Sequence, residues 1–345
     1  MRGHEKIHKK KIITTLNTKD MKRANTILTM ILLVVAGGRG YTQSTIDFIT
    51  VDITKSYPKK ELILQDIFDI EYIALETSDE FITRGIIRDI GNDIIIVTNA
   101  DMNGDFFLFD RNGKGLRKIN RKGQGPGEYI FAIDITLNED NNEMIITDMN
   151  RNMLVYDLFG NFKRRLHNSR DVYGNLGNFD RDHFICLCLT GNLVNGKMQG
   201  RERNEIFIIS KKDGSIIKEI EFPFEEKKWP IIVSPDGTRV SSSPGNFPWC
   251  PYRNNWVITE ISSDTIYSLL PDFSLVPFIV RTPSIQSMDP EVFLYQGVIS
   301  ERYYFMQTVK REYDFSTGTG WPRTNLVYDR QENAINECMV YNTDT

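Results

Sequence analysis

The chain has 345 residues, of which 40% are apolar and 11% aromatic, with 24 Gly, 13 Pro and 4 Cys. This apolar content can fill a sizeable core and excludes a mainly disordered, collagen-like or disulfide-dense chain. Residues 1–40 carry nine Lys/Arg against two Asp/Glu, whereas residues 41–345 carry 33 against 44. Because phosphate binding relies on Lys and Arg, the acidic body argues against a general nucleic-acid-binding protein.

The N-terminal part has the three regions of a secretory signal. Basic residues follow Met21, the apolar run 27–36 comes next, and residues 37–40 are mostly Gly. This run of ten residues is shorter than the roughly 20 residues that a membrane span needs. We therefore expect cleavage near Gly38 or Gly40 and export to the periplasm or cell envelope; an uncleaved N-terminal anchor is the alternative.

Residues 1–20 form a basic stretch without a pattern, which favours Met21 over Met1 as the natural start. No Cys follows the apolar run, so we expect no lipid attachment at a new N-terminal Cys. These observations divide the chain into residues 1–40, an upstream extension with a signal peptide, and residues 41–345, a single domain.

The body of the chain repeats itself. Residues 101–113 align without gaps on residues 148–160, with identical Asp, Met and Asn at the front and identical Asp and Gly at the rear. Looser copies follow at 206–220, 264–280 and 325–333. Each copy is an apolar run, a polar turn and a second apolar run, which is typical of antiparallel strands.

A lone sheet of three or four strands cannot bury its apolar side chains. Stacking repeated sheets around an axis covers their faces, and an all-strand period in the forties to fifties is typical of a β-propeller. Turns near residues 112, 159, 213, 271 and 331 give five clear blades. The sequence thus predicts an all-β, six-bladed β-propeller, with a partial sixth blade completed by the N-terminal strands at 48–53 and 70–75.

Residues 113–129 resemble a family of exported bacterial six-bladed β-propellers related to NHL-repeat propellers, which has an Arg-Lys-Gly-x-Gly-Pro-Gly-Glu-Tyr link between blades. Shorter pieces at 72–77, 154–157 and 263–267 agree with it. The resemblance implies the six-bladed fold but brings no established catalytic residue. The chain departs from the family in lacking a lipoprotein Cys after the signal and in ending earlier.

The Gly-rich link offers the first candidate ligand-binding residues. Arg121, Lys122, Gln124 and Glu128 are expected near the mouth of the central channel, with structural anchoring as the alternative. The link lacks the Lys-Ser/Thr and the helix start of a phosphate-binding loop. Its glycines instead permit positive φ and close backbone approach.

A second candidate is the aromatic stretch 247–252, which the sequence suggests to be an exposed loop. Trp249 and Tyr252 offer large apolar surfaces that suit a sugar or a peptide. The alternative is a cluster that caps a blade. Within the same part of the chain, Cys250 is isolated in sequence, and its pairing with Cys338 stays open.

Catalytic patterns are few. The body holds only His167 and His183 and no Gly-x-Ser-x-Gly, which disfavours nucleophilic hydrolysis and a catalytic zinc site. Asp101, Asn103 and Asp105 have the spacing of calcium ligands, but Gly is missing at the sixth position and Glu at the twelfth, so a polar turn is the better interpretation. Cys186 and Cys188 lie on one face of a strand and should not bridge each other.

The sequence therefore predicts an exported, non-catalytic, monomeric propeller without a cofactor, which binds a protein, peptide or glycan through loops at one face of its channel. The alternative is a metal-dependent hydrolase or lactonase of the six-bladed type, with Glu, Asp and Asn ligands on the axis. A third hypothesis is a structural subunit of an envelope assembly.

Overall fold

The computed structural model describes residues 48–99, 103–167, 175–187, 192–194, 197–199, 205–243 and 248–344. Within these residues, five main sheets each contain four antiparallel strands, and two of them carry a fifth, parallel strand. Each of these sheets is called a blade below.

The strands follow one another blade by blade. The first blade contains β3 (Ile86–Ile90), β4 (Ile94–Thr98), β5 (Asp105–Asp110) and β6 (Gly115–Asn120). The second contains β7 (Ala132–Asn138), β8 (Glu143–Asp148), β9 (Met153–Asp157) and β10 (Phe162–Leu166), with the 3₁₀ turn η2 (Glu139–Asn141) after β7. The third contains β11 (Leu176–Asn178), β12 (His183–Leu187), β15 (Ile206–Ser210) and β16 (Ile216–Glu219).

The last two blades include strands from the N-terminal part of the chain. The fourth contains β19 (Trp249–Tyr252), β20 (Asn255–Ile258), β21 (Thr265–Leu269), β22 (Leu275–Thr282) and β1 (Ile49–Asp52). The fifth contains β23 (Val292–Ile299), β24 (Tyr303–Lys310), β27 (Arg323–Asp329), β28 (Ala334–Tyr341) and β2 (Lys59–Ile63). The short helix α1 (Leu64–Ile67) follows β2, and the 3₁₀ turn η3 (Ile285–Ser287) follows β22.

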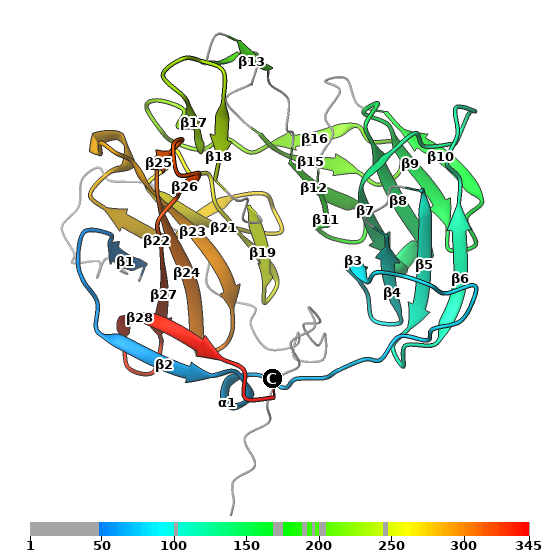
Figure 1. Cartoon of the computed structure of the whole chain (residues 1–345), viewed down its shortest axis with the longest axis horizontal. Helices are drawn as coiled ribbons and strands as arrows, with labels where there is room; N and C mark the ends of the chain where they lie inside the picture. Colours follow the sequence, from blue (N-terminus) through cyan, green and yellow to red (C-terminus); the bar gives the residue numbers. More distant parts are fainter. Residues whose placement is uncertain are drawn as a thin grey trace, which may run out of the picture.

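Three two-stranded hairpins lie outside the blades. They are β13 (Asn192–Val194) with β14 (Lys197–Gln199), β17 (Ile231–Val233) with β18 (Val240–Ser242), and β25 (Tyr313–Asp314) with β26 (Thr319–Gly320). Figure 1 shows the blades arranged around a common axis, with β3, β11 and β19 toward the centre and β6 and β10 at the periphery. The predicted propeller architecture is confirmed.

Blades pack face to face because their central strands are apolar on both sides. In β5, Phe106 and Leu108 pack toward the second blade, whereas Phe107 and Phe109 join a separate cluster with Phe81. Burying one such side chain stabilises the fold by roughly 1.5–3 kcal/mol. The four-residue apolar run in β5 thus belongs to two interfaces at once, as the radial stacking requires.

The predicted turns form where the repeat placed them. The Asp110 carboxylate accepts hydrogen bonds from the amides of Asn112 and Lys114, at 2.8 and 2.9 Å. In the copy 47 residues later, the Asp157 carboxylate accepts from the amides of Phe159 and Asn161, at 2.9 and 2.8 Å. An Asp at this position therefore stabilises the turn through its own side chain.

The N-terminal strands lie elsewhere than the sequence suggested. They do not complete a separate sixth sheet: β1 pairs in parallel with β22, and β2 pairs in parallel with β28. Both partners are outermost strands, whose outer edges offer unpaired N–H and C=O groups to a passing segment. The predicted strand at 70–75 is not formed: residues 70–77 belong to no strand, and the Glu76 amide donates to the Gly113 carbonyl in a turn of the first blade.

The chain from α1 to the start of β3 connects the fifth blade to the first. Near α1, the Gln65 side chain hydrogen-bonds to Asn342 at 2.5 Å. Further along, Ile73, Leu75 and Phe81 pack on the apolar face of the first blade. None of the helices in the described ranges is long and apolar enough to cross a membrane.

Candidate functional site at the loop end of the propeller

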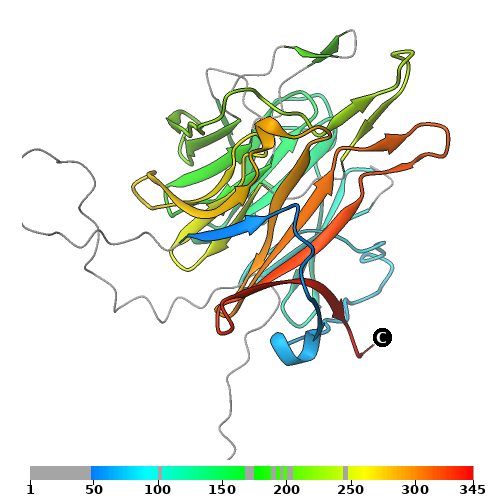
Figure 2. The same cartoon turned by 90° about the vertical axis from the view of Figure 1, so that its left-hand side faces the viewer.

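Long connections gather at one end of the blades. In an antiparallel blade, the connection from the second strand to the third and the link to the next blade leave from the same end. All three hairpins are inserted in such connections. We call this end the loop end; Figure 2 shows β17–β18 and β25–β26 projecting from it.

Two of the hairpins hold each other in place. The Arg311 guanidinium donates two hydrogen bonds to the carbonyl oxygen of Ile231, at 3.1 and 2.9 Å. Trp321 donates its ring N–H to the Ser241 hydroxyl at 2.9 Å. Arg239 donates to the Phe315 carbonyl at 2.6 Å. The loop end is therefore braced by side chains and offers a preformed surface.

The Gly-rich link is tied to both blades that it joins. The Tyr129 hydroxyl donates to the Gly104 carbonyl and accepts from the Arg121 amide, both at 2.7 Å, and burial raises the pKa of Tyr129 to about 12. The Arg121 side chain donates to the Gly160 carbonyl in the second blade at 2.8 Å. Arg121 thus anchors the link to the turn between β9 and β10.

The remaining candidates of the link are exposed. The Glu128 carboxylate folds back and accepts from the Gly125 amide at 2.8 Å. A Cβ at Gly123 would lie 2.0 Å from a Glu128 oxygen, so a side chain there would displace the Glu128 carboxylate from its position against the Gly125 amide. The structure therefore brings Arg121, Lys122, Gln124 and Glu128 together on one link at the loop end. Their role in ligand binding stays a prediction.

The second candidate stretch corrects the expectation of an exposed aromatic loop. Trp249 and Tyr252 belong to β19 and are only 8% and 7% exposed. Trp249 packs between the third and fourth blades, and the Tyr252 hydroxyl lies 3.0 Å from that of Tyr304 in the fifth. The Pro-rich composition suggested a loop, but pairing with β20 and packing against neighbouring blades decide the strand. Phe247 lies outside the described residues.

Sequence reasoning missed an apolar patch beside the link. Ile130, Ile133 and Met149 are 41%, 37% and 60% exposed. They lie together because the Met149 amide donates to the Phe131 carbonyl at 2.9 Å. We call these three residues the loop-end patch. The available signal was Met149 itself, an apolar residue in a turn whose other members are polar.

Two carboxyls of the inner strands were also missed. Asp89 in β3 accepts from the Leu137 amide of β7 at 2.7 Å. Asp134 in β7 accepts from the Asn175 side chain, at the start of the third blade, at 3.3 Å. Burial raises the pKa of both carboxyls. Each carboxyl thus links two neighbouring inner strands. The Asp-Ile pair that occurs in both β3 and β7 was the sequence signal for these two carboxyls.

The residues with calcium-like spacing hydrogen-bond to neighbouring side chains and turns, as the polar-turn interpretation expects. The Asp105 carboxylate accepts from the side chains of Asn103 and Asn120, both at 2.9 Å. In the repeat copy, Asp148 accepts from the backbone and side chain of Asn152. Across the described part of the chain, no group of three or more His, Cys, Asp or Glu is placed to hold a metal ion. Asp101 lies outside this part.

The His and Cys residues take local positions. The His183 ring lies 2.9 Å from the Asp180 carboxylate and edge-on to Phe273. Cys250 and Cys338 are free thiols, which answers the open question of pairing between them, and Cys186 is buried in β12. Cys188 and the signal region fall outside the described residues.

Blades stacked around an axis, with long connections at one end, define a β-propeller with a candidate binding surface at that end. The chain belongs to the family described as 6-bladed beta-propeller (DUF5128), which matches residues 42–345. The six-bladed class that the sequence suggested is thereby confirmed.

The solved structures that are similar to this chain share little sequence with it. One, a candidate exported protein of Bacteroides fragilis NCTC 9343, has 15% identity and a TM-score of 0.53, covering 84% of this chain and 79% of its own. Another, a DUF4221 member from Bacteroides vulgatus ATCC 8482, has 10% identity and a TM-score of 0.46, covering 76% and 83%. Virginiamycin B lyase of Staphylococcus aureus, in a complex with quinupristin, has 12% identity and a TM-score of 0.36, covering 73% and 69%. No curated protein matches the sequence.

Proposed function

We propose that this protein is an exported, non-catalytic β-propeller that binds a protein, peptide or glycan at its loop end. The observation that carries the proposal is the loop-end patch, with Ile130, Ile133 and Met149 exposed beside a charged link. Apolar side chains surrounded by polar ones form the usual core and rim of an interaction surface. The apolar centre favours a protein or peptide among the three ligand classes.

The rigidity of the surroundings supports the same proposal. The link beside the patch is fixed by hydrogen bonds of Arg121 and Tyr129. A surface that is already ordered loses less conformational entropy on binding. Export is supported by the signal pattern at 21–40.

A binding screen tests this function. Residues 41–345 are screened against a peptide library and a glycan array, and the best ligand is measured by calorimetry. Met149→Glu places a charge in the loop-end patch and should weaken binding at least tenfold. Leu116→Glu is the matched control, because Leu116 is an exposed apolar residue on the outer strand β6. Equal affinity in both variants would refute the loop end as the binding surface.

The hydrolase alternative has its own test. A resident metal needs several oxygen or nitrogen ligands that converge. We expect metal analysis of the purified, dialysed protein to find no stoichiometric calcium or zinc. A retained equivalent of either ion would favour the enzyme over the binding protein.

A further inference from the structure

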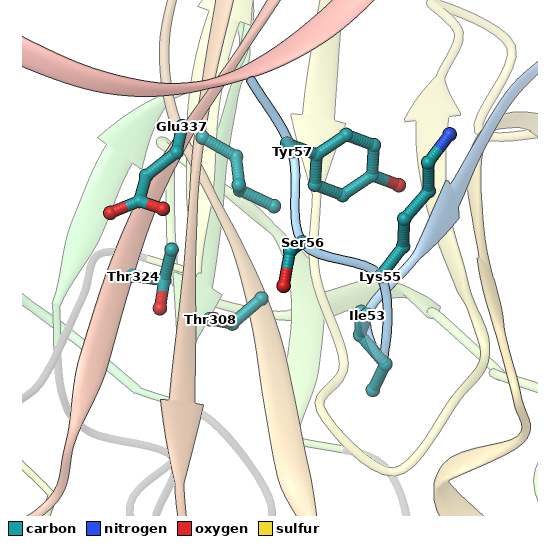
Figure 3. Close-up of a pocket in the computed structure, with 8 residues that line it drawn as sticks. Ile53, Lys55, Ser56, Tyr57, Thr308, Thr324 and Glu337 are labelled. Atoms are coloured by element: carbon teal, nitrogen blue, oxygen red, sulfur yellow. The ribbon is translucent and has the colours of Figure 1, made fainter. Parts of the chain in front are cut away.

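A small polar cavity lies under the segment that connects β1 to β2. This segment, residues 53–58, is called the strap because it crosses from the fourth blade to the fifth. The cavity has a volume of about 130 Å³. Its walls are formed by Ile53, Lys55, Ser56, Tyr57, Thr308, Thr324, Leu326 and Glu337 (Figure 3).

The floor of the cavity is a polar area on an otherwise apolar face of the fifth blade. Thr308 of β24 and Thr324 of β27 are direct cross-strand partners, and Glu337 of β28 is the partner of Leu326. On the same face, Met306 and Leu326 pack against the fourth blade. Two hydroxyls and one carboxylate thus take positions that the pattern of the blade would give to apolar side chains.

The Glu337 carboxylate is left without a partner among the described residues, although its residue is half-buried. The basic residue of the wall, Lys55, directs its ammonium toward the Tyr57 ring, 5.5 Å from the centroid. Lys59 of β2 is the register partner of Glu337 but does not line the cavity. Figure 3 shows this ammonium and the Tyr57 hydroxyl turned away from Glu337 and Thr324. The Tyr57 hydroxyl accepts from the Asp52 amide at 2.9 Å.

We propose that this cavity binds a primary ammonium group. An ammonium has three donors and no acceptor, and the cavity offers a carboxylate and the hydroxyls of Ser56, Thr308 and Thr324. An anion would meet the Glu337 charge. A divalent ion such as calcium needs six to eight oxygen ligands, usually with several carboxylates.

The size of the cavity sets the length of the ligand. A water molecule in the liquid occupies about 30 Å³, so the cavity holds about four such volumes. That space fits an ammonium with a short alkyl chain, as at the end of a lysine side chain. A lysine side chain of a peptide and a free alkylamine both carry such an ammonium group.

The strap cavity is separate from the loop-end patch. It lies between the strap and the fifth blade, whereas Ile130, Ile133 and Met149 belong to the second blade and the link before it. A ligand in the cavity would contact the strap and the fifth blade together. We therefore expect occupancy to slow hydrogen exchange in residues 53–58. Failure here would leave the proposed function intact.

Calorimetry at pH 7 with two probes tests the site. The probes are n-butylammonium and Nα-acetyl-lysine methylamide, and the negative probe is the same lysine derivative acetylated at Nε. We expect saturable binding of at least one ammonium probe and none of the acetylated compound. A preference for butylammonium identifies a free amine as the ligand, and a preference for the lysine derivative identifies a peptide side chain.

Three variants distinguish binding in this cavity from a general effect of the protein's charge. Glu337→Gln keeps the shape of the side chain and should weaken binding about tenfold, since the ammonium then meets a neutral amide oxygen in place of a charged carboxylate. Thr324→Val should weaken it less. Glu61→Gln is the matched control, because Glu61 is an exposed carboxylate on the adjacent strand β2, and it should bind as the unaltered protein does.

Four results would overturn the ammonium site. They are the absence of saturable binding, equal binding of the acetylated probe, unchanged affinity in Glu337→Gln, or full displacement of the amine by an equal concentration of sodium or potassium. The circular dichroism spectrum and melting temperature of each variant confirm that it is folded, so a loss of binding can be assigned to the cavity.

Discussion

Asp329 should hold the N-terminal strand β2 on the fifth blade. Its side chain is 0% exposed and accepts from Lys60 of β2 at 2.9 Å and from Arg302 at 2.8 Å. It also accepts from the Gln331 amide at 2.9 Å. The resulting hydrogen bonds hold the pKa of the Asp329 carboxyl far below its usual value, against the effect of burial.

Replacing Asp329 by Ala removes these contacts. Hydrogen bonds to charged groups contribute roughly 1.5–3 kcal/mol each, but Lys60 and Arg302 are 20% and 40% exposed and regain water. We therefore expect a loss of about 3 kcal/mol in the free energy of unfolding. Glu332→Ala is the control, because Glu332 contacts Lys60 from a 53% exposed position, and it should cost under about 1 kcal/mol.

Urea unfolding followed by circular dichroism measures both losses, and hydrogen exchange of residues 59–63 reports release of β2. Because the folded pKa of Asp329 lies below its ordinary value of 3.8, its charge stabilises the fold fully above about pH 4. This contribution falls as the pH drops from there toward the folded pKa. Equal losses in the two variants, or unchanged exchange in β2 of Asp329→Ala, would refute the reasoning.

Three further predictions concern contacts between blades. Gly91→Ala would place a Cβ 2.2 Å from the Glu139 carboxylate, so it should cost about 1–3 kcal/mol of unfolding free energy and be non-additive with Glu139→Ala in a double-mutant cycle. Lys211 is buried, and burial lowers its pKa from 10.5 to about 8; the native state thus binds fewer protons between these values. The free energy of unfolding of the unaltered protein, relative to that of Lys211→Met, should therefore rise with pH over that range. A difference in urea midpoints that does not change with pH would contradict this. Trp249→Ala should cost roughly 3–5 kcal/mol in urea unfolding, whereas a loss under about 1 kcal/mol would mean that the ring is not part of the core.

Local sequence patterns determined the elements of this protein. The copies at 101–113 and 148–160 share an Asp and a Gly around the same turn, and these residues form the same hydrogen-bonded turn in two blades. The run at 106–109 alternates between two apolar clusters. Period-2 alternation and turn chemistry depend on neighbours in the chain, so they can be read without knowing the fold.

Only part of the candidate site could be predicted from the sequence. The Gly-rich link is at the loop end, because the order of strands in a blade fixes where a link leaves. Trp249 and Tyr252 were expected on the surface but are buried, since the blades on either side cover them. The loop-end patch at Ile130, Ile133 and Met149 was missed because exposure depends on what packs nearby, and no local pattern reports it.

The sequence by itself determined the strand repeats, the turns and the propeller class, because the burial of thin sheets allows few arrangements. Only the tertiary structure decided that β1 and β2 join the outer edges of the fourth and fifth blades. Parallel pairing at an edge joins segments that are more than 200 residues apart, and it leaves no periodic trace in either of them. The strap, and the polar cavity beneath it, exist only because of that long-range pairing.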